Sequence, residues 1–222
     1  VWSAETLKAI ACWAIEHDIW IITDEIYEHM IYDGKKTDYI GALVPEVRDR
    51  LIVLNGVAKT YAMTGWRVGW LIGPENVAKA VGKLQGHLTS NVSNIPQRAA
   101  LAAVSGDLTA VEMMREAFDK RRHAIVSALN DMPGVTCALQ AGAIYACADF
   151  SRLLGKPLGK QQTVCENTVE LAALILDEVH VAAVPGEGFS APGHIRFSYA
   201  LADDDLAEGM RRLKQWLAAY AG

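Results

Sequence analysis

The sequence predicts an α/β fold: part of a mostly parallel large-domain sheet with covering helices, followed by a smaller α+β C-terminal domain. Two observations support this prediction. First, three short apolar segments, residues 19–23, 50–56 and 67–73, follow a helix-like N-terminal segment, as in the strands of an α/β sheet. Second, the pattern changes after about residue 131, where short strand-like segments alternate with helix-like ones.

The first part of the chain contains helices as well as strands. Residues 3–18 carry apolar side chains at helical spacing, and Ser3 is a suitable N-cap. The pattern is helical again from residue 74 to about 104, with an interruption at the polar segment TSNVSNIPQ, residues 89–97. A long helix is expected at about residues 109–131, because a Pro-Gly pair follows it.

The last part of the chain has a different order of elements. Residues 134–150 predict two strands, 165–179 a helix, and 179–186 and 194–200 further strands. A helix over 202–220 closes the chain, with aspartates in its first turn, where they suit the helix dipole. We therefore expect three parts, residues 1–105, a linking helix at 106–130, and residues 131–222.

Charge and cysteine content exclude several classes of protein. The formal net charge of −5 and the absence of a long basic cluster argue against a nucleic-acid-binding protein. No CxxC spacing links the cysteines, which favours reduced thiols in a cytoplasmic protein over disulfides or a zinc site. No apolar segment is long enough to predict a membrane span, and no metal site is expected. The four cysteines are Cys12, Cys137, Cys147 and Cys165.

Five polar residues stand at strand ends or in a strand, where open α/β sheets bind ligands. Asp24 and Tyr27 follow the first expected strand, and Lys59 follows the second. Arg67 opens the third, and Arg196 lies in a strand of the last part. Each has an ordinary structural explanation when taken alone, such as a cap, a packing residue, a solvated lysine or an ion pair. Their joint placement favours a catalytic site.

This set of side chains suits pyridoxal phosphate chemistry. An amine is needed to form a Schiff base with the cofactor aldehyde, and a carboxylate must keep the pyridine nitrogen protonated. A phenol can donate to the ring oxygen, and a guanidinium can bind the phosphate. A second guanidinium can hold the α-carboxylate of an amino acid with two parallel hydrogen bonds.

Three segments resemble fold-type I pyridoxal-phosphate aminotransferases, specifically the class I aspartate aminotransferase group. They are TDEIYEHMIYDG (23–34), NGVAKTYAMTGWRVGWLIGP (55–74) and GHIRFSYA (193–200). The resemblance implies that residues 1–105 are the C-terminal part of the large cofactor-binding domain and that 131–222 form the small domain. It also implies that the 222 residues are the C-terminal portion of a longer protein and are inactive by themselves.

The resemblance assigns a role to each of the five residues. Lys59 would form the Schiff base, and Asp24 would face the pyridinium nitrogen. Tyr27 would contact the ring O3′, and Arg67 would bind the phosphate of pyridoxal 5′-phosphate. Arg196 would hold the substrate carboxylate. The expected reaction transfers an amino group between aspartate and 2-oxoglutarate in a cytoplasmic homodimer, with the polar segment 89–97 reaching the neighbouring subunit's cofactor.

Two departures from the family pattern and two alternatives accompany this expectation. Ala58 precedes the lysine where many relatives have serine, and Ile144 stands where an aromatic residue is usual. One alternative is a different pyridoxal-phosphate reaction on the same fold, such as a β-lyase or a decarboxylase, because fold does not fix the reaction. The other is an aminotransferase-like sensor domain of a transcription regulator.

Overall fold

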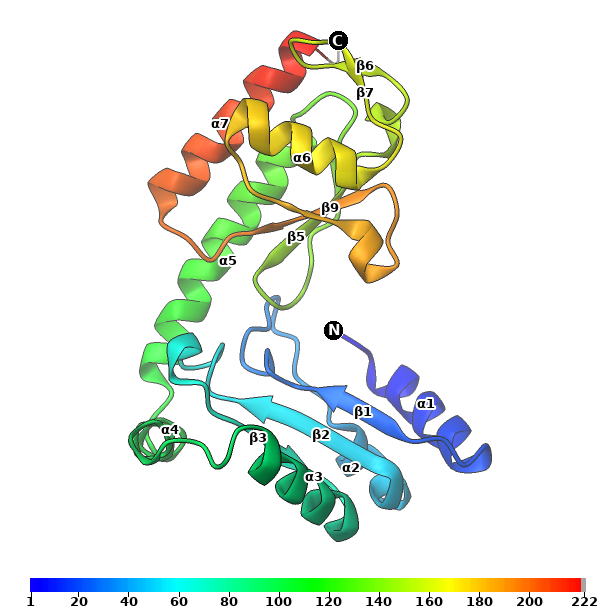
Figure 1. Ribbon diagram of the computed structural model, residues 1–222, viewed down its shortest axis with the longest axis vertical. Coiled ribbons are helices and arrows are strands. Elements are labelled where there is room, and N and C mark those ends of the chain that lie inside the picture. Colours follow the sequence, from blue (N-terminus) through cyan, green and yellow to red (C-terminus); the bar gives the residue numbers. More distant parts are fainter. Residues whose placement is uncertain (221–222) are drawn as a thin grey trace. The chain divides into compact units, whose positions relative to one another are not determined.

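The computed structural model describes residues 1–220 and divides into two compact units, Val1–Arg115 and Glu116–Gly222. The boundary falls inside helix α5 (Thr109–Asn130). Figure 1 shows the helices and strands of both units. None of the helices in the described residues combines the length and the apolar character that crossing a membrane requires.

The first unit is built on a three-stranded sheet in the order β1–β2–β3. Two 3₁₀ helices, Pro45–Arg50 and Thr64–Trp66, lie just before β2 and just before β3. The strands and α-helices of this unit that precede α5 are β1 (Ile21–Asp24), β2 (Leu51–Gly56), β3 (Gly69–Ile72), α1 (Ala4–Glu16), α2 (Ile40–Leu43), α3 (Glu75–Leu88) and α4 (Asn94–Ser105).

The sheet of the first unit contains both a parallel and an antiparallel strand pair. β1 and β2 are parallel, with Ile21 opposite Leu51, as the sequence predicts. β3 is antiparallel to β2, with Gly56 opposite Gly69, a direction that the expectation of a mostly parallel sheet left open. The reason lies in the connection: residues 57–68 form turns and a 3₁₀ helix, whereas a parallel crossover usually needs an α-helix.

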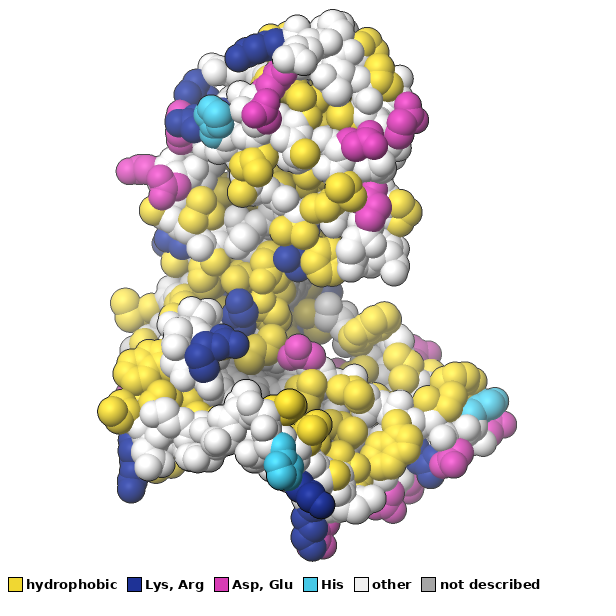
Figure 2. All heavy atoms as spheres, in the orientation of Figure 1, with side chains coloured by type: hydrophobic (Ala, Val, Ile, Leu, Met, Phe, Trp, Pro, Cys, Tyr) yellow, Lys and Arg dark blue, Asp and Glu magenta, His cyan; other side chains and the backbone are white. Residues whose placement is uncertain are grey.

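The core of the first unit lies between the sheet and the helices α1 and α2 (Figure 1). Much apolar surface outside this core is exposed: Ile22 is 64% exposed and Ile72 is 61% exposed. Figure 2 shows hydrophobic side chains gathered on the visible face of this unit. The buried core residues are Ala11, Ile40, Val47 and Leu51, with Leu7, Ile15, Ile21, Val44 and Val53 packed against them.

The second unit contains a four-stranded antiparallel sheet in the order β4–β5–β9–β8. A separate hairpin of two short strands, β6 and β7, is an element that the sequence does not predict. The bounds of the elements are β4 (Thr136–Cys137), β5 (Tyr145–Asp149), β6 (Pro157–Leu158), β7 (Thr163–Val164), α6 (Thr168–Val179), β8 (Val184–Pro185), β9 (His194–Ser198) and α7 (Asp203–Tyr220), with 3₁₀ helices at Ser151–Leu153 and Gly186–Phe189.

The core of the second unit follows the alternation of its two central strands. Ala146 and Ala148 of β5 and Ile195 and Phe197 of β9 are buried, while the residues between them are partly exposed. The strand expected at residues 179–186 shrinks to β8, because α6 extends to Val179 and ends at His180 in a left-handed conformation.

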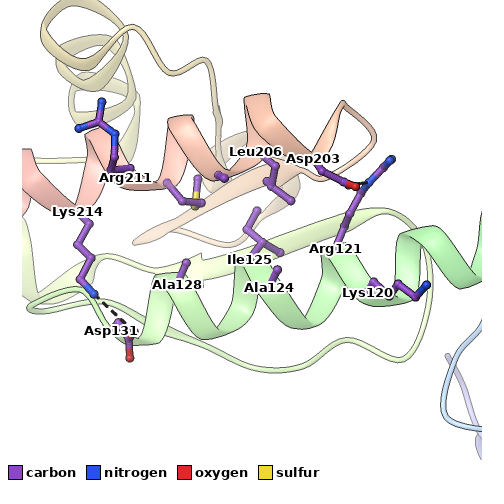
Figure 3. A pocket seen from close by; sticks show the side chains of 12 residues that line it. Lys120, Arg121, Ala124, Ile125, Ala128, Asp131, Asp203, Leu206, Arg211 and Lys214 are labelled. Carbon is purple, nitrogen blue, oxygen red and sulfur yellow. Dashed lines mark hydrogen bonds and ion pairs between the residues drawn. The ribbon is translucent and has the colours of Figure 1, made fainter.

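Helices α5 and α7 line an open cavity of about 510 Å³ in the second unit (Figure 3). Its floor is apolar, with Ile125 of α5 and Leu206 of α7 pointing toward each other in Figure 3. One end carries the ion pair between Lys214 and Asp131, whose Nζ–Oδ2 distance is 3.5 Å. None of the sequence-predicted site residues lines this cavity.

Candidate active site

The strand directions of the first unit bring four of the five predicted residues to one edge of its sheet. β1 ends at Asp24 and β2 ends at Gly56, and these carboxyl ends share an edge because the two strands are parallel. β3 begins at Gly69 on the same edge because it is antiparallel, which places the preceding Arg67 there too. A parallel third strand would have started at the opposite edge. The antiparallel direction of β3 therefore brings Arg67 to the same edge as the other three residues.

Asp24 is exposed at the end of β1 and shapes the turn that follows. Its Oδ1 accepts a hydrogen bond from the backbone N–H of Ile26 at 3.1 Å, a local pattern typical of aspartate in turns. No ion pair joins Asp24 to any residue within 1–220. Its carboxylate is thus open to a cationic ligand atom.

Lys59 lies in the turn after β2 and is half-buried. Its Nζ is 5.9 Å from the centroid of the Tyr27 ring, which brings together the amine and the phenol that the sequence predicts. Across the part of the chain that the structure describes, no carboxylate forms an ion pair with Lys59. The amine of Lys59 is therefore not engaged in an ion pair and is available to a ligand.

The residues around Lys59 fix the course of this turn. At Gly56 a Cβ would lie 2.8 Å from the carbonyl oxygen of Val68, so the close approach of the two chain segments requires glycine. Thr60 is 1% exposed, and its hydroxyl has no hydrogen-bond partner among the described residues. A buried hydroxyl without a partner next to the amine is consistent with a place that a polar ligand completes.

Arg67 is exposed and precedes β3. Its backbone has φ 55° and ψ 48°, a left-handed conformation that is uncommon for residues other than glycine. Its Nη1 donates to the carbonyl oxygen of Thr64 at 2.9 Å, and no carboxylate within residues 1–220 pairs with it. The remaining guanidinium N–H groups can therefore bind an anion.

Arg196 belongs to the second unit and is held between two aromatic rings. Its guanidinium carbon is 4.3 Å from the ring centroid of Tyr145 and 4.3 Å from that of Phe189. Stacking of this kind orients the planar group and leaves its N–H edges available. Burial raises the pKa of the neighbouring Cys147 thiol, and the positive charge of Arg196 lowers it in part.

The aromatic partners of Arg196 are residues that the sequence interpretation missed. Tyr145 follows Ile144, the departure from the family pattern, and Ile144 itself is buried. The Ile144 carbonyl accepts a hydrogen bond from the backbone N–H of Tyr199 at 3.1 Å, so the strand connection is kept without an aromatic side chain there. Phe189 is half-exposed in the 3₁₀ helix before β9, and no pattern in the sequence indicates its contact with Arg196.

Acidic groups also lie beside the sheet edge of the first unit. Burial raises the pKa of Glu25, with a further increase from the negative charge of Glu28, while a hydrogen bond from Thr23 lowers it. Burial and then the hydrogen bond to Glu28 raise the pKa of Tyr39 above its usual range. Glu25, Glu28 and Tyr39 border a pocket of about 670 Å³ that none of the five predicted residues lines.

Comparison with known proteins identifies the family. Residues 1–213 match the family described as aminotransferase class I and II, and the chain belongs to that family. It is 56% identical over 219 residues to an aspartate aminotransferase of Streptomyces avermitilis, covering 98% of this chain and 53% of the relative. It is 39% identical over 221 residues to an aspartate aminotransferase of Geobacillus stearothermophilus, covering 100% of this chain and 55% of the relative.

The fold comparison agrees with the sequence comparison. The crystal structure of an aspartate aminotransferase from Rhizobium meliloti superposes with a TM-score of 0.93 at 32% sequence identity, over 99% of this chain and 55% of that one. The α/β fold class and the resemblance to fold-type I aminotransferases are thereby confirmed. The chain spans about half the length of the relatives that it matches.

Proposed function

We propose that the intact protein containing these 222 residues is a pyridoxal 5′-phosphate-dependent aminotransferase that moves an amino group between aspartate and 2-oxoglutarate. The observation that carries the proposal is the arrangement at one sheet edge of an amine, a carboxylate, a phenol and a guanidinium, from Lys59, Asp24, Tyr27 and Arg67. Membership of the aminotransferase family and 56% identity to an aspartate aminotransferase support the reaction type.

The residues at this edge fit the cofactor. When bound, pyridoxal phosphate supplies an aldehyde and an electron-withdrawing ring. The Lys59 amine and the Arg67 guanidinium have no ion-pair partner within residues 1–220, so each can receive one end of such a molecule. Asp24 provides the carboxylate that a protonated ring nitrogen requires.

Each residue then has a distinct task. Asp24 would keep the ring nitrogen protonated by its negative charge, and Tyr27 would donate a hydrogen bond to the ring oxygen. Lys59 would hold the cofactor through its amine and would move the proton at the substrate α-carbon as a general base. Arg67 binds the phosphate through parallel N–H groups.

Arg196 is the residue that we propose for binding the carboxylate of the substrate. Its guanidinium is stacked between Tyr145 and Phe189 and makes no ion pair within the described residues. A planar group held in this way can bind an α-carboxylate with two parallel hydrogen bonds. We therefore assign recognition of the amino acid and of the 2-oxo acid to Arg196.

We extend the proposal to the organisation of the intact protein. Residues 1–105 would be the C-terminal part of the large cofactor-binding domain, residues 106–130 the linking helix and 131–222 the small domain. The intact protein would be a cytoplasmic homodimer. Light scattering at catalytic dilution should give twice the mass of the intact chain, and a fully active monomer would contradict this part.

Lys59 gives the direct test. Borohydride reduction of the intact protein with pyridoxal phosphate, followed by peptide mapping, should place the pyridoxyl group on Lys59. Lys59→Ala should abolish transamination. Lys79→Ala is the matched control, since Lys79 is exposed on α3 and pairs with Glu75. A pyridoxyl group on any other lysine would refute the assignment.

The products separate the proposed reaction from other chemistry of this cofactor. Aspartate and 2-oxoglutarate should give oxaloacetate and glutamate in equal amounts. Release of ammonia or carbon dioxide at the catalytic rate would instead indicate a lyase or a decarboxylase. Arg196→Lys should raise KM for both substrates and lower kcat, because a point charge replaces a planar fork.

A further inference from the structure

We propose that Glu28 is a positioning residue for the amine of Lys59, an inference that rests on the proposed function. Glu28 follows Tyr27 directly, and its side chain is 19% exposed. Glu28 would hold the turn after β1 against the end of β2, and Lys59 lies in the turn that follows β2. Nothing in the sequence pattern alone identifies this residue.

Both oxygens of the Glu28 carboxylate accept a hydrogen bond, each from a different segment. Oε1 accepts from Nδ2 of Asn55 at 2.7 Å, and Oε2 accepts from the hydroxyl of Tyr39 at 2.7 Å. The Glu28 carbonyl oxygen also accepts from the hydroxyl of Thr37 at 2.7 Å. His29 lies 3.9 Å from Oε1, too far for a hydrogen bond. One residue thus joins three parts of the chain.

Asn55 continues this connection toward Lys59. Its Oδ1 accepts from the backbone N–H of Gly56 at 2.7 Å while its Nδ2 donates to Glu28. The orientation of the amide follows from its partners, because a flipped amide would place oxygen against the carboxylate and nitrogen against an N–H group. Gly56 is the last residue of β2, and Lys59 comes three residues later.

The geometry explains why a carboxylate is suited to this position. The bonds from Asn55 and Tyr39 fix the orientation of Glu28, and the neighbouring Tyr27 is thereby fixed relative to the turn after Gly56. Tyr27 and Lys59 face each other across this connection, with 5.9 Å between the amine and the ring centroid. Because the two hydrogen bonds come from different segments, they hold the turn by their geometry. Displacement of a reacting group by about 1 Å can cost about a hundredfold in rate.

The decisive experiment measures how fast Lys59 reacts, independently of turnover. The intact protein is stripped of cofactor, mixed with pyridoxal phosphate and quenched with borohydride at intervals, and the label on Lys59 is quantified. Glu28→Ala should slow labelling between about tenfold and about a hundredfold, because the amine is no longer held in place. It should also change the pH dependence of the bound-cofactor absorbance. Glu46→Ala, at an exposed glutamate of the same unit, is the control and should behave as the wild type.

Two further variants distinguish the positioning role of Glu28 from an effect of its negative charge and from a general loss of folding. Glu28→Gln keeps one acceptor for Asn55 and can donate to Tyr39, so labelling should stay within about threefold of the wild type. If labelling of Lys59 in Glu28→Gln were as slow as in Glu28→Ala, the negative charge of Glu28 and not its hydrogen-bond geometry would control the reaction. That result would overturn the proposal. If circular dichroism shows that Glu28→Ala does not fold, Asn55→Ala tests the same connection and should slow labelling to a similar extent.

The outcomes distinguish this inference from the function on which it rests. A wild-type protein labelled on Lys59, with Glu28→Ala or Asn55→Ala labelled equally fast, would overturn the positioning role alone. A wild-type protein labelled on another lysine, or on none, would overturn the proposed function and this inference with it.

Discussion

The two units bury their apolar residues to different extents. Most of the fully buried hydrophobic side chains in the described residues belong to the unit that begins at Glu116, although the two units are similar in length. The first unit has a small core under β1 and β2, and it exposes large apolar side chains such as Trp2, Ile22 and Leu88. Large exposed apolar areas mark places where a protein contacts other surfaces. The unit that carries the candidate catalytic lysine is therefore the one with less of its own stabilisation.

The largest expected difference between the two units is in the local stability of their strands. Hydrogen exchange of the 222-residue chain should protect the amides of β9 at least about a hundredfold more than those of β1, because local opening free energies range from near zero to the global value. The edge of β1 that faces away from β2 has no strand partner among residues 1–220. Equal protection of β1 and β9 would show that the exposed apolar area does not weaken the first unit.

Substitution of matched isoleucines sharpens the comparison. Ile195→Ala removes a side chain that is fully buried in β9 and should reduce the free energy of unfolding by about 2–5 kcal/mol. Ile22→Ala, at an exposed position of β1, should change it by no more than about 0.5 kcal/mol. Urea unfolding followed by circular dichroism measures both. A large loss for Ile22→Ala would mean that this residue is covered in solution.

The helix N-caps offer a smaller test of the same difference. Asn167 accepts from the backbone N–H of Glu170 at 3.0 Å, and Ser3 accepts from that of Thr6 at 3.1 Å. Replacing either with alanine removes a cap that is worth about 1 kcal/mol. Asn167→Ala should lower the stability of the second unit by that amount, because α6 packs on its core. Ser3→Ala should only fray α1, and Asn167→Asp should restore the wild-type value.

The smallest expected effect on stability comes from protonation of Glu208 on the surface of α7 at low pH. Hydrogen bonds from Arg211 and Arg212 lower the pKa of Glu208 from 4.5 to about 2. A lowered folded-state pKa stabilises the fold above pH 4.5, and this contribution is lost as the pH falls toward 2. The melting temperature of Glu208→Gln should thus differ from the wild type above pH 4.5 and converge with it near pH 2. A constant difference would contradict the ion-pair explanation.

The sequence predicts much of the second unit because its patterns are local. The long helix α5 and the closing helix α7 follow from periodicity and end signals, and β5 and β9 follow from alternation. The direction of β3 could not be predicted, since periodicity is the same for parallel and antiparallel strands. The hairpin β6–β7 was missed because each strand has only two residues.

The same limit applies to the candidate site. Asp24, Tyr27, Lys59 and Arg67 could be chosen because they stand at strand ends, where chemistry is expected. The stacking of Phe189 on Arg196 and the bond between Glu28 and Asn55 could not, because they depend on how separate segments approach each other. Contacts between distant segments leave no periodic pattern in a single sequence. Three-dimensional structure was needed to find them.

The left-handed backbone of Arg67 has a consequence for selection experiments. Glycine and asparagine adopt this conformation more easily than arginine, so the backbone alone favours them at position 67. A library of all twenty residues at this position should give different winners under two selections. Selection for folded, soluble protein should enrich glycine and asparagine, whereas selection for growth that depends on transamination should retain arginine. The difference in residue frequencies between the two selections measures how much growth depends on the guanidinium of Arg67.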